Sequence, residues 1–231
     1  MWKRTAGGLT LTFHLAGINN QNFLMRDEQT GTFWQQISGR AVSGPLAGSQ
    51  LELVYSDELS FRLWRAEAPS GTVLKPLPED ARDYAEKDWD VRMQKARTVI
   101  DFPNSGLPAR ELILGVQAFG TVRAYPVARI LSAKLIEDRL GSEPIIVVLG
   151  PDNKSIRVFH ARLHDSEPAP AFYRLNNQST FMDSLTGSEW SFNGCAVNGK
   201  DRGTCLDPVW AIKDYWFDWR NYHPDTTIFR R

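Results

Sequence analysis

Cysteine is scarce in this sequence, with only two among 231 residues, and the familiar catalytic signatures are absent. The chain has no Cys-x-x-Cys, His-Glu-x-x-His, Gly-x-Ser-x-Gly or Gly-x-Gly-x-x-Gly stretch. These patterns are typical of redox, zinc, serine-hydrolase and dinucleotide sites. Carboxylates are plentiful, but no two of them stand out as an acid–base pair. We therefore expect no catalytic residues, no metal site and no cofactor, and the balance is against an enzyme.

An excess of charge of one sign and long apolar runs are missing as well. Lys plus Arg and Asp plus Glu both number 27, so the formal net charge is zero, which argues against an extended nucleic-acid footprint. No apolar run approaches the roughly 18–20 residues of a membrane span. The N-terminal stretch MWKRTAGGLTLTF lacks the apolar core of a signal peptide. We expect no nucleic-acid partner, no membrane span and a cytoplasmic protein. An export signal upstream in the native chain would instead make it periplasmic or extracytoplasmic.

What the sequence does contain is an internal repeat. The stretch DEQTGTFW at 27–34 returns 156 residues later as DSLTGSEW at 183–190, and GRAVSG at 39–44 returns 155 residues later as GCAVNG. Aromatic pairs keep the second spacing: Phe61 and Trp64 match Trp216 and Trp219. A nearly constant offset over roughly 55 positions predicts two tandem copies of one structural unit.

The two copies are not equally complete. Residues 111–159 precede the second copy and predict a hairpin at 113–126, a helix at 127–135 and strands at 143–150 and 154–163. Nothing in the chain matches this block ahead of the first copy. We therefore expect 1–75 to be the C-terminal half of a first unit, 76–110 a linker with a short helix, and 111–231 a complete second unit. The predicted fold is α+β: two related units of small mixed or antiparallel sheets with short helices, packed about a pseudo-two-fold axis.

The repeated phrase supplies the candidate site residues. An Asp that opens a turn can accept hydrogen bonds from backbone N–H groups two or three residues later, and a Gly supplies the positive φ that closes a hairpin. A Trp on the outgoing strand packs well on one face of a sheet. This pattern favours a hairpin turn with a core Trp, and a ligand site is the alternative. The residues concerned are Asp27, Thr30, Gly31 and Trp34 with their counterparts Asp183, Thr186, Gly187 and Trp190.

Cys195 lies within the glycine-rich stretch of the second copy, and Cys205 lies shortly after it. The stretch is also a near match to a phosphate-binding loop. In GCAVNGKD the residue Asp201 stands where a hydroxyl would meet Mg²⁺, so we reject nucleotide binding. Cys195 and Cys205 replace Arg40 and Gln50 of the first copy, so the repeat requires neither cysteine. Three alternatives are open for these cysteines: a disulfide across a hairpin, two free thiols, or a redox pair.

Two segments that end at proline, 57–69 and 209–224, are each predicted to be a helix, the second starting at Asp207 and Pro208. His160 and His164 alternate with apolar residues, so we expect both to face water rather than to bind a metal.

The assembled motifs resemble a known family. FLMRDEQTGTFWQQISGRAVSGPLAGSQLELV and DSLTGSEWSFNGCAVNGKDRGTCL both resemble the core signature of the bacterial family catalogued as domain of unknown function 3179 (DUF3179). GVQAFGTVRAYPVARILSAKLIEDRLGSEPIIVV resembles that family's N-terminal half. The resemblance implies two copies, the first without its N-terminal half. Members often carry a Cys-x-x-Cys between the halves, whereas the matching stretch here, 149–155, has no cysteine.

These observations favour a non-catalytic binding or interaction module whose partner is another protein or a second copy of the chain. The alternative is a thiol–disulfide redox or soft-metal-handling protein that uses the two cysteines. A weaker alternative is a carbohydrate-binding module that uses Asp27 with Trp34 and Asp183 with Trp190.

Overall fold

The chain is an α+β protein built mainly from small antiparallel sheets. The computed structural model describes residues 1–19, 22–84, 86–100, 102, 105–164, 166, 168–174 and 180–230. Across these residues no helix combines the length and apolar character needed to cross a membrane.

The N-terminal region forms one four-stranded antiparallel sheet with a small core of its own. The strands follow in the order β3 (Phe13–Asn19), β4 (Asn22–Asp27), β5 (Phe33–Gln35) and β6 (Ala41–Ser43). A two-stranded hairpin, β1 (Thr5–Ala6) with β2 (Leu9–Thr10), precedes the sheet. The fully buried residues of this core are Leu11, Trp34, Ala41 and Leu51.

Two sheets built from residues 112–228 face each other. One has the order β17 (Ala211–Tyr215), β7 (Leu112–Ala118), β8 (Thr121–Pro126) and β18 (Thr227–Ile228), and its β8–β18 pair is parallel. The other has the order β16 (Pro208–Val209), β11 (Ile156–His160), β10 (Glu143–Leu149) and β9 (Leu135–Leu140). Helix α3 (Val127–Ala133) contributes Ile130 to the core between them. Helix α4 (Trp216–Tyr222) packs Trp216 and Trp219 on the outer face of the sheet that contains β7 and β8.

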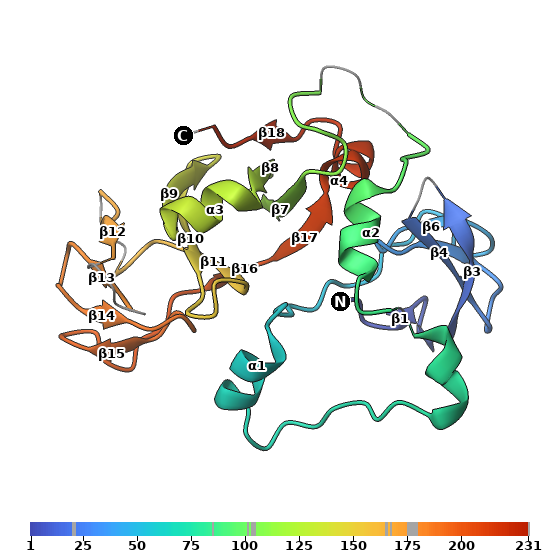
Figure 1. Cartoon of the computed structure of the whole chain (residues 1–231), viewed down its shortest axis with the longest axis horizontal. Coiled ribbons are helices and arrows are strands. Elements are labelled where there is room, and N and C mark those ends of the chain that lie inside the picture. The colour runs from blue at the N-terminus through green and yellow to red at the C-terminus, as the bar shows by residue number, and fades with distance from the viewer. Residues whose placement is uncertain are drawn as a thin grey trace.

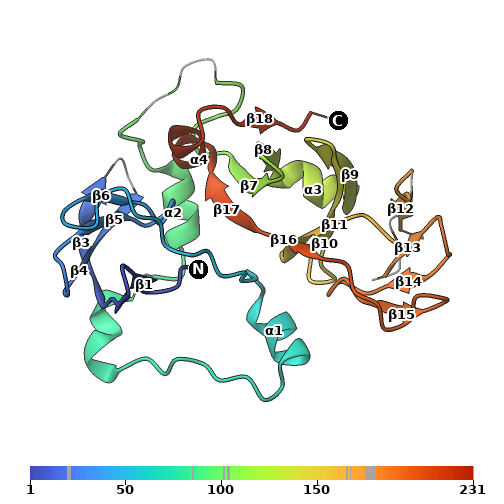
Figure 2. The ribbon, with the colours of Figure 1, turned by 180° about the vertical axis from the view of Figure 1, so that it is seen from behind.

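The last sheet has the order β12 (Phe172–Tyr173), β13 (Phe181–Asp183), β14 (Glu189–Trp190) and β15 (Ala196–Asn198). It packs on the opposite face of β10, where Ile146 and Val148 meet Phe181 and Trp190. Burial of β10 on both faces explains its continuous apolar sequence. Figure 1 shows this sheet and the N-terminal sheet at opposite ends of the molecule, and the view from behind in Figure 2 agrees.

Helix α1 (Phe61–Glu67) follows the N-terminal sheet in the chain but docks on the second half of the chain. Leu59 and Leu63 pack on the core that β10 shares with the last sheet. The backbone N–H of Ser60 donates to the Ser155 hydroxyl at 2.9 Å, and Ser60 in turn caps the helix by accepting from the backbone N–H of Leu63. A 3₁₀ turn (Pro78–Asp83) and α2 (Trp89–Lys95) follow.

Most locally encoded elements are where the sequence predicts them. The hairpin at 113–126 is β7 and β8, and Phe119 and Gly120 at its turn both have positive φ, as a two-residue hairpin turn requires. The helix after Pro126 and the strand at 143–150 are confirmed, and the strand predicted at 154–163 is present over the shorter range 156–160. The short helix expected within residues 76–110 is α2. The pseudo-two-fold packing and the domain boundaries stay predictions.

The helix predicted over 209–224 is wrong in its first half. Residues 211–215 form β17, which pairs with β7 along five residues, and Pro208 lies in β16 rather than at a helix start. The helix begins only at Trp216. Hydrogen bonding to a strand almost a hundred residues earlier decides the conformation here, because tertiary pairing overrides a weak local preference.

Candidate functional site

The first repeated phrase forms a hairpin turn around a buried carboxylate. Asp27 accepts hydrogen bonds from the backbone N–H of Thr30 at 2.5 Å and from the Trp34 indole N–H at 2.8 Å. Gly31 has positive φ, which the turn requires. The Thr32 hydroxyl accepts from the backbone N–H of Leu46 at 3.1 Å and also bonds the Thr30 hydroxyl. Asp27, Thr30, Thr32 and Trp34 therefore all have structural partners within the N-terminal region.

The second phrase builds the same turn in the last sheet. Asp183 accepts from the backbone N–H of Thr186 at 2.6 Å and from the Trp190 indole at 2.9 Å. Gly187 again has positive φ. The Ser188 hydroxyl accepts from the backbone N–H of Asp201 at 3.0 Å, as Thr32 does from Leu46. The structure does not bring the two turns together, since they lie in the sheets at opposite ends of the molecule (Figure 1).

Both tryptophans are fully buried, which removes the carbohydrate interpretation. Trp34 and Trp190 each have 0% of their surface exposed, so neither offers a ring face on which a sugar could stack. Burial alone would raise the pKa of Asp27 and of Asp183, but the hydrogen bonds from the turn and the indole hold both pKa values below their usual range. These carboxylates stay ionised and act as turn anchors rather than as general acids.

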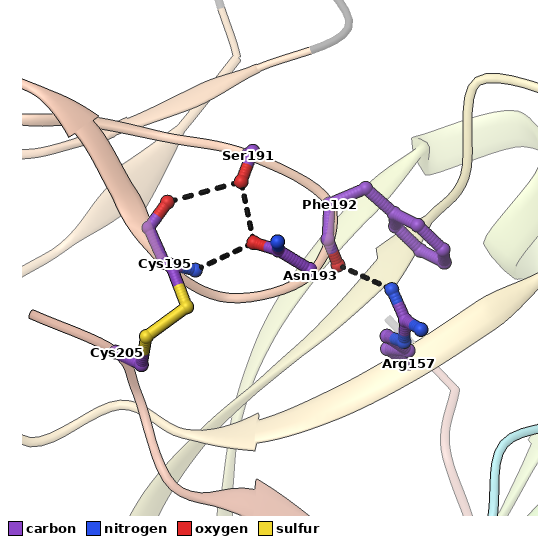
Figure 3. The surroundings of a disulfide bond; sticks show 6 residues. All are labelled: Arg157, Ser191, Phe192, Asn193, Cys195 and Cys205. Atoms are coloured by element: carbon purple, nitrogen blue, oxygen red, sulfur yellow. Dashed lines mark hydrogen bonds between the residues drawn. A yellow bond between two sulfur atoms is a disulfide. The ribbon is translucent and has the colours of Figure 1, made fainter. Parts of the chain in front are cut away.

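Cys195 and Cys205 are joined by a disulfide bond. They lie opposite each other as an isolated antiparallel bridge, in the place that Arg40 and Gln50 occupy in the first sheet. Cys195 is half-buried and Cys205 is exposed. In Figure 3 the bond lies beside the 191–195 turn, where Asn193 accepts from the backbone N–H of Cys195 and the Phe192 carbonyl accepts from Arg157.

The last sheet carries one polar pair that the first sheet lacks. The Asp201 carboxylate, nearly fully buried, lies 2.6 Å from the His164 ring and 2.6 Å from the Thr186 hydroxyl. The first sheet has the apolar Leu46 at the matching place. Asp201 also points inward to its own turn, so it is not a phosphate-loop residue. His164 is largely exposed, as predicted, but His160 is mostly buried and bonds Glu143 at 2.9 Å. Among the described residues, no three His, Cys, Asp or Glu side chains gather as metal ligands.

A buried arginine ties α1 to the second half of the chain. The guanidinium of Arg157, on β11, donates twice to Glu67 at 2.7 and 2.9 Å and once to Asp57 at 2.7 Å. It also lies over the Phe192 ring. Burial alone would lower the pKa of Arg157, but the two carboxylates outweigh this and raise it. No local sequence pattern marks this cluster, because Arg157 lies 90 and 100 residues from its two partners.

Two carboxylates meet between β17 and α4 without enough partners. Asp218 is buried and accepts a hydrogen bond from the Asn22 amide at 3.1 Å, while its Oδ1 has no partner. The Oδ2 of Asp214 is buried and unpartnered as well. Burial, and for Asp214 also the neighbouring charge of Asp218, raises the pKa of both groups. No motif marks them, because only the pairing of β17 with β7 and the start of α4 at Trp216 place them side by side.

The N-terminal sheet exposes a row of apolar side chains on its outer hairpin. Leu15, Ile18 and Phe23, here called the β3–β4 apolar surface, are 66%, 69% and 52% exposed. Ile18 and Phe23 lie directly opposite each other across the hairpin. β3 is the edge strand of its sheet, and no strand in the described part of the chain pairs with its outer edge.

The fold thus defines an α+β protein of several small sheets, with structural turns at the repeated motifs and an open apolar edge at one end. The chain belongs to the family described as protein of unknown function (DUF3179), whose model matches residues 1–226. No curated protein matches the chain, and no solved structure does.

Proposed function

We propose that this chain is a non-catalytic binding module that associates with protein through the outer edge of β3. The main support for this proposal is the β3–β4 apolar surface, in which three large apolar side chains on one hairpin are each more than half exposed. Exposed apolar groups that lie together on an edge strand are uncommon in monomers and mark sites of association.

The edge of β3 fits an added strand. An edge strand presents unpaired backbone N–H and C=O groups, and a partner strand that pairs with them gains main-chain hydrogen bonds. β3 is seven residues long, enough for such a ladder. Residues 15–19 of this strand carry no charged side chain, so an approaching apolar strand meets no unpaired charge there.

A second copy of the chain is the partner that this edge fits best. Two β3 strands that pair antiparallel about a two-fold axis place the same surface on both sides of the interface, which is the commonest symmetry of soluble dimers. The absence of charge over residues 15–19 means that the two copies do not repel each other there.

We further propose that the chain contains two tandem copies of one unit, with 1–75 as half of the first and 111–231 as the second. The support is a set of matching details in the two end sheets. β4–β5–β6 and β13–β14–β15 have the same order and direction, and each has a register shift just before its buried Trp. Each has the same bond from an indole to the Asp seven residues earlier.

The binding proposal is tested by the concentration dependence of the molecular mass. In sedimentation velocity, the wild-type chain should shift from monomer to dimer as its concentration rises. The double variant Leu15→Lys with Ile18→Lys should stay monomeric, because it places four positive charges at the shared strand pair. Val42→Lys is the matched control, since Val42 is 50% exposed on β6 at the opposite edge of the same sheet.

Circular dichroism would establish that all three proteins are folded. A wild-type chain that stays monomeric at every concentration would contradict the proposal that a second copy is the partner. A dimer that the two lysines leave intact would contradict the proposal that the β3 edge is the interface. A reproducible turnover abolished by one substitution outside the core would contradict the non-catalytic assignment.

A further inference from the structure

The disulfide of the last sheet joins two residues that the backbone already holds face to face. Cys195 and Cys205 are flanked by two ladder hydrogen bonds, from Ala196 N–H to the Thr204 carbonyl at 2.8 Å and from Leu206 N–H to the Gly194 carbonyl at 2.9 Å. The two Cα atoms are 3.9 Å apart. The cysteines are therefore the non-hydrogen-bonded pair of a short antiparallel ladder.

The same ladder exists in the first sheet without any covalent bond. There Ala41 N–H donates to the Ser49 carbonyl at 2.9 Å, and Leu51 N–H donates to the Gly39 carbonyl at 3.0 Å. The pair enclosed by these bonds is Arg40 and Gln50. Because an arginine and a glutamine occupy this pair, the same backbone arrangement forms without a covalent bond.

The disulfide is also open to attack from solvent on one side. Cys205 is exposed, whereas Cys195 is half-buried beside the 191–195 turn (Figure 3). The Ser191 hydroxyl donates to the Cys195 carbonyl at 3.0 Å, and Asn193 accepts from its N–H. An incoming thiolate therefore reaches the sulfur of Cys205 more readily than that of Cys195.

We propose that Cys195–Cys205 is a thiol–disulfide exchange site that reacts reversibly with dithiol reductants through the sulfur of Cys205. Three features support this proposal: the exposure of Cys205, the ladder that needs no covalent bond, and the backbone hydrogen bonds that keep the thiols opposite each other after reduction.

The exchange balances as a two-electron reaction. One thiolate of the external dithiol attacks Cys205 Sγ, a new S–S bond forms, and the Cys195–Cys205 bond breaks. The electron pair of the broken bond leaves on Cys195 as a thiolate, which takes a proton from water. The second thiolate of the dithiol then attacks the first sulfur of the same dithiol, which is bonded to Cys205. This closes the disulfide of the oxidised dithiol and releases Cys205 as a thiolate. The protein disulfide is reduced to two thiols and the dithiol is oxidised to a disulfide.

The ladder makes the reverse reaction efficient. Closure of the bond is intramolecular, and the two thiols are held at a high effective concentration because the backbone bonds on either side of them persist. An oxidant such as glutathione disulfide should therefore restore the bond without accumulation of a stable mixed disulfide.

The first test is reduction of the wild-type chain by dithiothreitol without denaturant. Alkylation and mass spectrometry should show both thiols free while the near-ultraviolet circular dichroism is retained. Tm should fall by about 5–10 °C, the loss expected when a short loop is opened in a chain of this size. Removal of the reductant and addition of glutathione disulfide should restore the bond. The double variant Cys195→Ser with Cys205→Ser should be folded and have the same Tm as the reduced protein.

The second test locates the reacting sulfur with a matched pair of single variants. Glutathione disulfide should modify Cys205 in Cys195→Ala about ten times faster than Cys195 in Cys205→Ala, because accessibility controls the reaction of thiols of similar type. A disulfide that resists dithiothreitol until the protein is denatured would overturn the proposal. Loss of the near-ultraviolet signal on reduction, an unfolded double variant, or equal reactivity of the two single variants would overturn it as well.

Discussion

Asn22 of the N-terminal sheet donates a hydrogen bond to the buried carboxylate of Asp218 at 3.1 Å, across 196 residues of sequence. Asn22 is itself fixed, because its side-chain oxygen accepts from the Gln35 amide and from the backbone N–H of Ile37. The two halves of the chain therefore meet at a carboxylate that is short of partners, and the neighbouring Asp214 adds a second one.

This carboxylate pair should make the protein more stable in mild acid. A group whose pKa is raised by folding contributes its full stabilisation below the pKa of the unfolded chain, and the contribution is lost as pH rises through the folded pKa. Asp214→Asn should therefore raise the free energy of unfolding at pH 7.5 by about 1 kcal/mol, with a smaller gain at pH 5. Urea unfolding at the two pH values measures this. The exposed Asp225→Asn is the control and should be neutral at both.

The anchors of the repeated turns should behave in the opposite way. Asp27→Asn or Asp183→Asn should cost about 2–4 kcal/mol in urea unfolding at pH 7, because a donor amide replaces an acceptor oxygen beside the indole N–H or the turn. Glu28→Gln, next to Asp27 but exposed, should cost little. Since folding lowers the pKa of both aspartates, their contribution is present above the unfolded pKa and is lost as pH falls through the folded one. A loss unchanged at pH 2 would contradict this role.

The docking of α1 should depend on Arg157. Arg157→Lys should increase amide hydrogen exchange over residues 57–67, because the single ammonium of a lysine cannot reproduce the two-nitrogen fork that donates to both oxygens of Glu67 while also bonding Asp57. The matched control is Lys213→Met, which removes the ion pair of Lys213 with the neighbouring Glu58. That pair is more exposed, so its loss should cost less than about 1 kcal/mol. Equal exchange in both variants would mean that the apolar contacts of Leu59 and Leu63 alone hold the helix.

The glycine turn of the last sheet offers a prediction about close packing. Gly199 and Gly203 both have positive φ, so alanine should cost about 1–2 kcal/mol at either position through backbone strain. A Cβ on Gly199 would also lie 2.7 Å from the Cα of Ser188, whereas a Cβ on Gly203 would meet nothing within 4 Å. Gly199→Ala should therefore be the more damaging change, by about 1–3 kcal/mol in thermal or urea unfolding. Equal losses would show that the sheet moves aside at little cost.

The sequence predicts those features that short segments encode. The Asp–Gly–Trp phrases specify a turn and a buried aromatic within eight residues, and the β7–β8 hairpin follows from its own alternation and turn. Long-range contacts decide the rest. β17 is a strand because β7 lies beside it, and α1 docks because Arg157, 90 residues beyond Glu67, holds it.

The candidate sites divide in the same way. Nothing local distinguishes Asp214 from an ordinary surface carboxylate, since only the pairing of β17 and the start of α4 bury it against Asp218. The exposure of Leu15 and Ile18 is likewise invisible in an alternating apolar strand, because it depends on whether a neighbouring element covers them. The cysteine spacing allows a bridge, but the backbone hydrogen bonds on both sides are what bring the two residues together.

The ladder around Arg40 and Gln50 has a practical consequence for engineering. It has the same backbone arrangement as the ladder that carries the disulfide in the last sheet, so a disulfide can be introduced at the same place in the N-terminal sheet. A chain carrying Arg40→Cys and Gln50→Cys would have a tether in each end sheet, on otherwise similar scaffolds. Mechanical unfolding of singly and doubly tethered chains, before and after reduction, would then report which end of the molecule yields first.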